Sequence, residues 1–469
     1  MSLKDRIGKG LTEYLYPYMQ QHGGNNMPQK TLKYEEYKLK ERYLWFLGEE
    51  DLLADFYQTC QPKYSLIDTR KSFYYSHVNQ KIRVVHSGLP GLISNGKAEL
   101  LLSGGVEATV DGEENEDLSD ILQDNNFYNT ILPESVVTES WGSKFAIKIS
   151  YDPEVSEFPI MEKYTPFNYR TICKRDRVQA IVFVNPYGEY ELEETYGYGY
   201  VYYNLFRVTE NGRHEVALTA CPETAELENI EFDSNLMLAV EKKIENSDYR
   251  GVIAEFDALD EAWSQLMDEI RTGRAETYVP EIRLVNKSFN DFRKTYVEVG
   301  NDMAEAATNQ ITHNQPNIRS EQYINSIVAI RNNILSNVKL NPLTIGIDDS
   351  VGANSSGTAI EKRETVSLRT RKAMINTWEP FLENLYETLL NAYYWINNIP
   401  HKEYDVNVTF GEYATPSIET KIANIVSLKN ADIIDDEKAL DEIYGDITEE
   451  EKDRILSNLG NITLGGTDV

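Results

Sequence analysis

Residues 91–97 form the segment that most closely resembles a nucleotide-binding motif. They read Gly-Leu-Ile-Ser-Asn-Gly-Lys, the glycine frame and lysine of a phosphate-binding loop. Ala98 stands where such a loop has the hydroxyl that ligates Mg²⁺, and Pro90 precedes the first glycine. We therefore expect a glycine-rich turn here, with nucleotide binding through Lys97 as an alternative.

Other residues capable of catalysis show no arrangement typical of an active site. The six histidines form no His-Glu-x-x-His motif, none lies near a cysteine, and no Gly-x-Ser-x-Gly elbow occurs. A Ser-His-Asp triad converges only in space, and carboxylate pairs arise easily among 76 acidic residues. We expect no catalytic residue, no metal and no cofactor; a carboxylate-using hydrolase remains the enzyme alternative.

The composition is that of an acidic chain with enough apolar residues to form cores. Its 469 residues suit two to four domains, and 46 basic against 76 acidic residues give a formal charge of −30. This excess argues against a surface that coats nucleic acid, because such surfaces neutralise phosphates with Lys and Arg. No apolar run approaches the roughly 18–20 residues of a membrane helix, and the N-terminus lacks the apolar region of a signal peptide. We expect a soluble intracellular protein that contacts no membrane.

The three cysteines and two clusters of basic residues have local interpretations. Cys60, Cys173 and Cys221 are far apart, so we expect buried free thiols. The basic clusters are expected to form salt bridges within or between chains, with phosphate contact as the alternative. The first comprises Lys163, Arg170, Lys174, Arg175 and Arg177, and the second comprises Lys362, Arg363, Arg369, Arg371 and Lys372.

The first half of the chain reads as helices followed by an antiparallel meander. Apolar spacing over 30–56 predicts helix with a break at Gly48, and the acidic stretch 111–124 predicts a solvated loop or helix start. Between 141 and 221, β-rich runs at 145–149, 178–184, 198–209 and 214–219 predict strands. Asn211-Gly212 predicts a hairpin between the last two, because a type I′ turn needs two residues with positive φ.

Two long amphipathic helices are predicted next, joined by a short insertion. The first carries an apolar stripe from Phe256 to Ile270 and ends before Pro280; the second carries one from Ile324 to Val338 and ends at Asn341-Pro342. The roughly forty residues between them suffice for a small α/β tip. The pattern indicates a stalk that carries a knob.

The remainder is predicted to contain a mobile loop, a third long helix, a strand and an acidic tail. The loop spans 345–357, and Thr358 to Glu361 have the spacing of a capping box that opens the helix. Pro380 should kink or divide this helix, because proline lacks the amide hydrogen. A strand is expected at 404–410, and acidic amphipathic helices at 417–459.

Three motifs in this order resemble a known family. They are Asp257–Ser264 through Tyr278–Pro280, the small-residue run 356–360, and the acidic segment 431–440 with 448–454. Together they resemble portal proteins of tailed double-stranded-DNA phages, in the branch typical of siphophages of Gram-positive hosts. The resemblance covers most of the chain in element order and is weakest over the first hundred residues.

The resemblance implies an α+β portal architecture assembled as a ring of about twelve subunits at one capsid vertex. The implied parts are a wing (1–250), a first stem helix (251–280), a clip (281–317), a second stem helix (318–341), a tunnel loop (342–357), a long kinked helix with a returning wing strand (358–412) and an acidic helical crown (413–469).

The resemblance also implies a role for particular residues. The tunnel loop would present Ile347, Asp348, Asp349, Ser350, Val351, Asn354, Ser355 and Ser356 to the channel. The stem would consist of helices carrying Leu259, Trp263, Leu266, Ile270, Ile324, Ile327, Val328 and Ile334. The clip would dock terminase or connector through Glu281, Arg283, Lys287, Arg293 and Lys294. The second basic cluster would supply inter-subunit or phosphate contacts.

The implied function is a conduit through which double-stranded DNA is packaged and ejected. Its implied partners are further copies of itself, the terminase large subunit, head–tail connector proteins, and the major capsid and scaffold proteins; it would assemble in the host cytoplasm and remain in the virion. Twelve copies would carry a charge of roughly −360, which favours sliding of DNA and only weak, non-specific binding. Another phage connector or baseplate protein, or an acidic cytosolic scaffold, remains an alternative.

Overall fold

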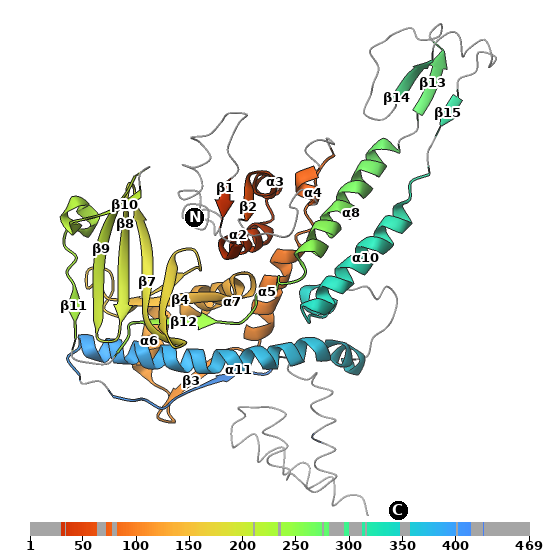
Figure 1. The fold of residues 1–469 in the computed structure, drawn as a ribbon. Coiled ribbons are helices and arrows are strands. Elements are labelled where there is room, and N and C mark those ends of the chain that lie inside the picture. The colour runs from red at the N-terminus through yellow and green to blue at the C-terminus, as the bar shows by residue number, and fades with distance from the viewer. Residues whose placement is uncertain are drawn as a thin grey trace, which may run out of the picture.

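The computed structural model combines helical layers, antiparallel sheets and a protruding pair of helices (Figure 1). It describes residues 30–32, 34–62, 72–76, 82–209, 212–232, 236–273, 276–280, 295–299, 312–314, 317–347, 357–399, 402–413 and 425. The predicted tunnel-loop residues after Ile347 and the predicted crown beyond Tyr413, Ile425 excepted, lie outside these ranges. Within the described ranges, no helix has both the length and the apolar character needed to cross a bilayer.

The N-terminal part is helical, as the sequence predicts. Helices α2 (Tyr34–Leu47) and α3 (Glu50–Thr59) are separated at Gly48, whose φ of +69° is readily adopted by glycine. Strands β1 (Lys30–Leu32) and β2 (Cys60–Pro62) pair in parallel, and the short helix α4 covers Phe73–Ser76. Buried aromatic side chains of these helices join one core cluster with the protruding helices.

The segment with the glycine frame is a helix, so both the phosphate-loop and the glycine-turn predictions are wrong. Helix α5 (Leu89–Leu102) starts with proline in its first turn, and residues 91–97 lie inside it. Gly96 is required for packing: a Cβ there would come within 2.5 Å of the Ile345 side chain. Lys97 is buried and forms an ion pair with Asp248, so its ammonium group is not presented to a phosphate at the surface.

Two antiparallel sheets make up the strand-rich region. In the first, β4 (Lys144–Ser150) lies between β5 (Ile160–Tyr164) and β12 (Ala239–Lys243). The second is the predicted meander, whose five consecutive strands are β6 (Tyr169–Lys174), β7 (Arg177–Tyr187), β8 (Tyr190–Gly197), β9 (Tyr200–Thr209) and β10 (Gly212–Val216), with β11 (Ile230–Glu231) also paired to β9. The antiparallel pairing of β9 with β10 confirms the predicted hairpin, although the turn residues 210–211 lie outside the description.

Helices α6 (Glu116–Asp124) and α7 (Leu132–Gly142) connect the helical part to the first sheet. The acidic stretch becomes the start of α6, where Asn115 caps the helix by accepting the Leu118 N–H at 2.9 Å. A π-helical turn, Phe127–Ile131, joins the two helices.

Helix α8 (Ile253–Thr272) and helix α10 (Ser320–Asn337) run antiparallel, side by side, and protrude from the body (Figure 1). A three-stranded sheet stands at their far end, where β13 (Glu276–Pro280) pairs in parallel with β14 (Thr295–Val299) and antiparallel with β15 (Thr312–Asn314). The predicted helix–insertion–helix order is therefore present.

Helix α11 (Gly357–Ile396) passes along the whole body and ends near the meander (Figure 1). It continues through Pro380, so the prediction that this proline divides the helix is wrong. The chain then returns as β16 (Val406–Phe410), which pairs with β3 (Val106–Val110), as the predicted strand at 404–410 requires. Buried residues of α11, α6, α7 and the first sheet form a second core cluster.

Candidate functional site: the paired helices and their anchors

The apolar stripes of α8 and α10 are buried near the body and exposed toward the tip. Leu259, Leu266, Ile327 and Ile334 are buried, and Trp263 and Val328 are partly buried. In contrast, Ile270 on α8 is 45% exposed and Ile324 on α10 is 50% exposed. The predicted stem residues thus belong to one helix pair, which is packed inside this chain along most of its length and exposes apolar residues only near its tip.

A polar face anchors α8 to residues 72–87 of the body. Asp257, Asp260 and Ser264 follow i, i+3, i+7 spacing and so lie on one side of the helix. Asp260 is fully buried, and its carboxylate accepts hydrogen bonds from Tyr74 Oη at 2.7 Å and from the Ser87 N–H at 2.8 Å. His86 Nδ1 lies 2.7 Å from the same carboxylate. The Asp260 carboxylate therefore has three hydrogen-bond partners from the body.

The other two members of this face extend the anchor in both directions. Asp257 accepts from Ser72 Oγ and from the Phe73 N–H, both at 2.8 Å, and Ser264 Oγ accepts from the Val85 N–H at 2.9 Å. Burial raises the pKa of Asp257 to about 6. Because this folded-state pKa exceeds the unfolded value, Asp257 contributes stability at low pH that is lost as pH rises from about 4 toward 6.

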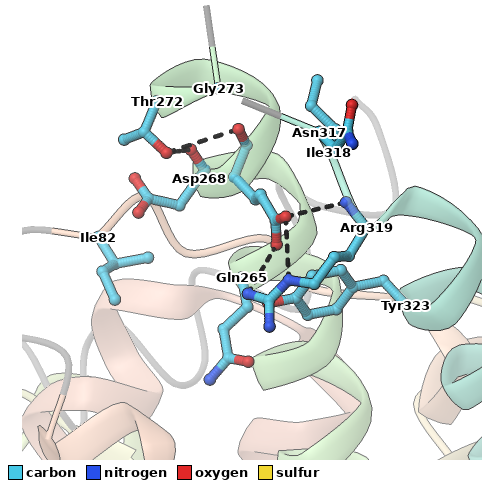
Figure 2. Close-up of a pocket in the computed structure, with 10 residues that line it drawn as sticks. Ile82, Gln265, Asp268, Thr272, Gly273, Asn317, Ile318, Arg319 and Tyr323 are labelled. Carbon is cyan, nitrogen blue, oxygen red and sulfur yellow. Dashed lines mark hydrogen bonds and ion pairs between the residues drawn. The ribbon is translucent and has the colours of Figure 1, made fainter. Parts of the chain in front are cut away.

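An ion pair holds the far ends of the two helices together, next to an open pocket of about 360 Å³ lined by both polar and apolar residues (Figure 2). Glu269 accepts the Arg319 backbone N–H at 2.9 Å, and the Arg319 guanidinium reaches both carboxylate oxygens at 3.2 Å. These hydrogen bonds, the backbone one first, lower the pKa of Glu269. A Cβ on Gly273 would come within 2.9 Å of the Ile318 side chain, so the chain leaving α8 and the chain entering α10 touch here.

The lower end of α10 is tied to α11. The Asn341 N–H donates to Ser367 Oγ at 2.9 Å, and Thr344 Oγ1 lies 2.7 Å from the same hydroxyl. Thr370 Oγ1 donates to the Lys339 carbonyl at 2.8 Å. These contacts fix the point at which the chain leaves the helix pair for residues 348–356.

Within the second basic cluster, Arg371 serves a structural role that the sequence prediction missed. It is buried, and its guanidinium donates to the carbonyls of Leu100 at 2.9 Å, Leu101 at 3.3 Å and Gly411 at 2.6 Å. The predicted phosphate or inter-subunit contact is wrong for Arg371, because it caps the end of α5 instead. Arg369 and Lys372 are exposed; the side chains of Lys362 and Arg363 lie outside the described set.

The first basic cluster divides into paired and exposed members. Lys163 pairs with Glu134 at 2.8 Å, and Arg170 pairs with Glu193 at 2.6 Å, as the salt-bridge interpretation predicts. Lys174, Arg175 and Arg177 are exposed around the β6–β7 turn and have no ion pair within the described residues. The cysteine prediction needs a similar correction, because Cys60 and Cys221 are buried but Cys173, on the same hairpin, is exposed.

A buried ion pair connects the first sheet to α7 and α11. Lys242 Nζ of β12 lies 2.8 Å from Glu139 Oε1 of α7, and 4.9 Å from the ring centroid of Trp378 on α11. Trp378 Nε1 donates to the other oxygen of Glu139 at 2.8 Å. Burial raises the pKa of Glu139, and Lys242 opposes that shift. No local sequence signal marks these three residues, because they are about 100 and 135 positions apart.

Among the described residues, no three His, Cys, Asp or Glu side chains gather as a metal site would require. The predicted docking residues of the clip, Glu281 to Lys294, lie outside the description, as do Asp348 to Ser356. The described contacts hold the helix pair to the body through Asp260 and join its far ends through Glu269 and Arg319.

Solved structures that resemble this chain share only about 10% of its residues. The search of curated protein sequences found no match. Similar solved structures include the neck of a native gene transfer agent particle computed with C12 symmetry, with 10% identity and a TM-score of 0.40, covering 77% of this chain and 91% of that one. Another is the neck of an empty particle computed with C6 symmetry, with 10% identity and a TM-score of 0.42, covering 80% of this chain and 99% of that one.

The family comparison is the decisive one. The model of the SPP1 Gp6-like phage portal proteins matches residues 30–462, which include the body, the helix pair, α11 and most of the acidic tail. The match spans nearly the whole chain, in agreement with the resemblance noted from the sequence. The chain therefore belongs to the SPP1 Gp6-like phage portal protein family.

Proposed function

We propose that this portal protein forms a closed ring of about twelve copies whose central hole conducts double-stranded DNA into and out of the capsid. The observation that carries the proposal is the α8–α10 pair, which is anchored at its base by buried hydrogen bonds and exposes apolar residues toward its tip (Figure 1). Apolar side chains that gather on an exposed surface favour contact with another protein surface. Neighbouring copies would supply that surface in a ring.

The regions of the chain would then take different positions along the channel. The body before residue 251 and α11 would form the wing, α8 and α10 the stem, and the three-stranded sheet with residues 281–317 the clip. Residues 347–356 would face the hole as a tunnel loop, and the acidic residues after 413 would form the crown.

We further propose that the clip docks the terminase large subunit during packaging and a head–tail connector afterwards. The major capsid and scaffold proteins would contact the wing during assembly in the host cytoplasm. The assignment to a siphophage of a Gram-positive host stays a prediction.

The charge of the chain suits a conduit better than a DNA-gripping protein. At −30 per copy, a ring of twelve would carry roughly −360, and such a field opposes tight phosphate binding. The tunnel-loop segment contains Asp348 and Asp349 and no Lys or Arg. DNA would therefore meet shallow, salt-sensitive contacts at most.

Portal proteins are structural. The lysine that could have bound a nucleotide in this chain forms an ion pair inside the protein. Lys97, the lysine of the supposed nucleotide motif, is buried and paired with Asp248. Energy for DNA movement would come from the docked terminase and not from this chain.

The mass of the purified full-length protein tests the ring. We expect light scattering or native mass spectrometry to give about 650 kDa, twelve times the 53.8-kDa chain. A monomer or dimer at micromolar concentration would contradict the proposal and favour a scaffold. A hexameric disc or an elongated trimer would favour another phage connector or baseplate protein.

A further inference from the structure

The first sheet and the β6–β7 hairpin together form a basic surface, here called the basic end. It comprises Lys144, Lys174, Arg175, Arg177 and Lys243. Lys144 and Lys243 are opposite each other on β4 and β12, and Lys144 Nζ lies 4.8 Å from the ring centroid of Tyr169 on β6. Tyr169 Oη of β6 also donates to Glu241 Oε1 of β12 at 3.0 Å, so the two sheets meet at this surface.

The hairpin turn holds its cations in a defined place. Arg175 and Asp176 have φ values of +53° and +59°. Lys174 and Arg177 stand opposite each other in the strand register on the two sides of the turn. Two central residues with positive φ are the geometry of a tight two-residue hairpin turn. The side chains of these four residues are exposed at the tip of the hairpin, just beyond a register shift between Ile172 and Cys173.

These cations differ from the other basic residues of the two sheets. Lys148, Lys163, Arg170, Arg207, Arg213 and Lys242 each form an ion pair with a glutamate of the same chain. Within the described ranges, none of the five residues of the basic end forms one. Asp176 and Glu241 are the nearby acids, and Glu241 accepts a hydrogen bond from Tyr169 at 3.0 Å. The surface therefore keeps a net positive charge in a strongly acidic chain.

An acidic surface lies at the other end of β4. This acidic end comprises the exposed residues Asp120, Asp124, Asp152, Glu154 and Glu157. Ser156 Oγ donates to Asp124 Oδ2 at 2.7 Å, and both Asp120 and Glu157 influence the pKa of Tyr393, so the loop after β4 and helix α6 share one surface. No lysine or arginine forms an ion pair with these five carboxylates in the described part of the chain.

The two surfaces lie at opposite ends of strand β4. Lys144 begins β4 and Ser150 ends it, so seven residues place the basic and acidic ends about 20 Å apart. Opposite charges at opposite ends suit a head-to-tail contact, in which one surface of a copy meets a different surface of the next. Such heterologous contacts generate closed rings when the rotation between copies closes.

We propose that the basic end of one copy docks on the acidic end of the neighbouring copy and sets the direction of ring closure. This inference rests on the proposed ring. A second copy is favoured over nucleic acid as the occupant because the chain carries the complementary surface itself. In addition, the net charge of −30 opposes the approach of a phosphate backbone.

Charge reversal tests the contact in the full-length protein. We expect K174E/R175E/R177E to raise the concentration at which half of the chains assemble by at least about tenfold, because like charges then face each other. D152K/E154K/E157K should do the same. The chain carrying all six changes should assemble as the unmodified protein does, since the attraction is restored with its signs exchanged. The control E215K/E226K/E228K alters three exposed glutamates elsewhere and should leave assembly unchanged.

The outcomes separate this contact from the ring itself. If the unmodified protein does not assemble, the proposed function fails and the contact fails with it. If the unmodified protein forms rings and both triple variants form them equally well, only the contact is wrong. Loss of duplex-DNA binding by K174E/R175E/R177E with unchanged assembly would instead assign the basic end to phosphate. If the variant that carries all six charge reversals does not recover assembly, the proposed contact between the basic and acidic ends is also overturned.

Discussion

Replacement of Asp260 by alanine is expected to lower the free energy of unfolding by about 3 to 5 kcal/mol, the range for breaking a buried charged network. The Asp260 carboxylate is fully buried and satisfies Tyr74 Oη, the Ser87 N–H and His86 at once. Its removal takes a shared acceptor away from these groups in a largely buried site. The same change removes the central polar contact of α8 with the body, while Asp257 and Ser264 keep their own hydrogen bonds.

Denaturant unfolding at one fixed protein concentration measures this loss, because assembly makes apparent stability depend on concentration. Asp268→Ala is the matched control on the same helix, since the Asp268 carboxylate is only half-buried and has no described hydrogen-bond donor. Its expected effect is within about 0.5 kcal/mol. A loss below about 1 kcal/mol for Asp260→Ala would show that α8 is held mainly by apolar packing.

Replacement of Lys242 by methionine is expected to cost about 3 kcal/mol near neutral pH. Glu139 would keep its buried carboxylate and the Trp378 N–H donor but lose the ammonium group at 2.8 Å. Burial already raises the pKa of Glu139, and loss of the cation should raise it further. Because the folded-state pKa then lies above the unfolded value, the penalty should be small at acidic pH and grow as pH rises.

A double-mutant cycle separates the pair from the packing around it. Glu139→Gln together with Lys242→Met should be less destabilising than the sum of the two single changes, with a coupling energy of at least about 1 kcal/mol. Arg83→Met, at an exposed cation with no described ion pair, is the control. Additive effects, or a Lys242→Met penalty that does not vary with pH, would mean that the ion pair contributes nothing measurable.

The sequence predicted those features that depend on local periodicity or on element order. The stripes of α8 and α10, the meander strands and the glycine break at Gly48 follow from residue spacing alone. The phosphate-loop pattern failed because glycine spacing does not distinguish a loop from a helix that uses Gly96 for close packing against Ile345. The division at Pro380 failed because the buried face of α11 on both sides of it packs against one core.

The anchors could not be predicted, because their partners are distant in sequence. Arg371 lies in a local basic cluster that favoured a surface role, yet its acceptors are carbonyls some 270 and 40 positions away. Asp260 bonds to residues more than 170 positions earlier. The one available signal was the presence of Asp257, Asp260 and Ser264 on the helix face toward the core, where polar residues need partners.

The proposed channel depends most on the position of α8 and α10 relative to neighbouring copies. Electron microscopy of the purified assembly tests it directly, by placing the helices in a reconstruction of the particle. We predict a ring of about twelve copies in which the α8–α10 pairs of all copies surround one central hole wide enough for duplex DNA, with α11 radiating outward. An assembly that places these helices on the outer rim, or one without a central hole, would contradict the channel.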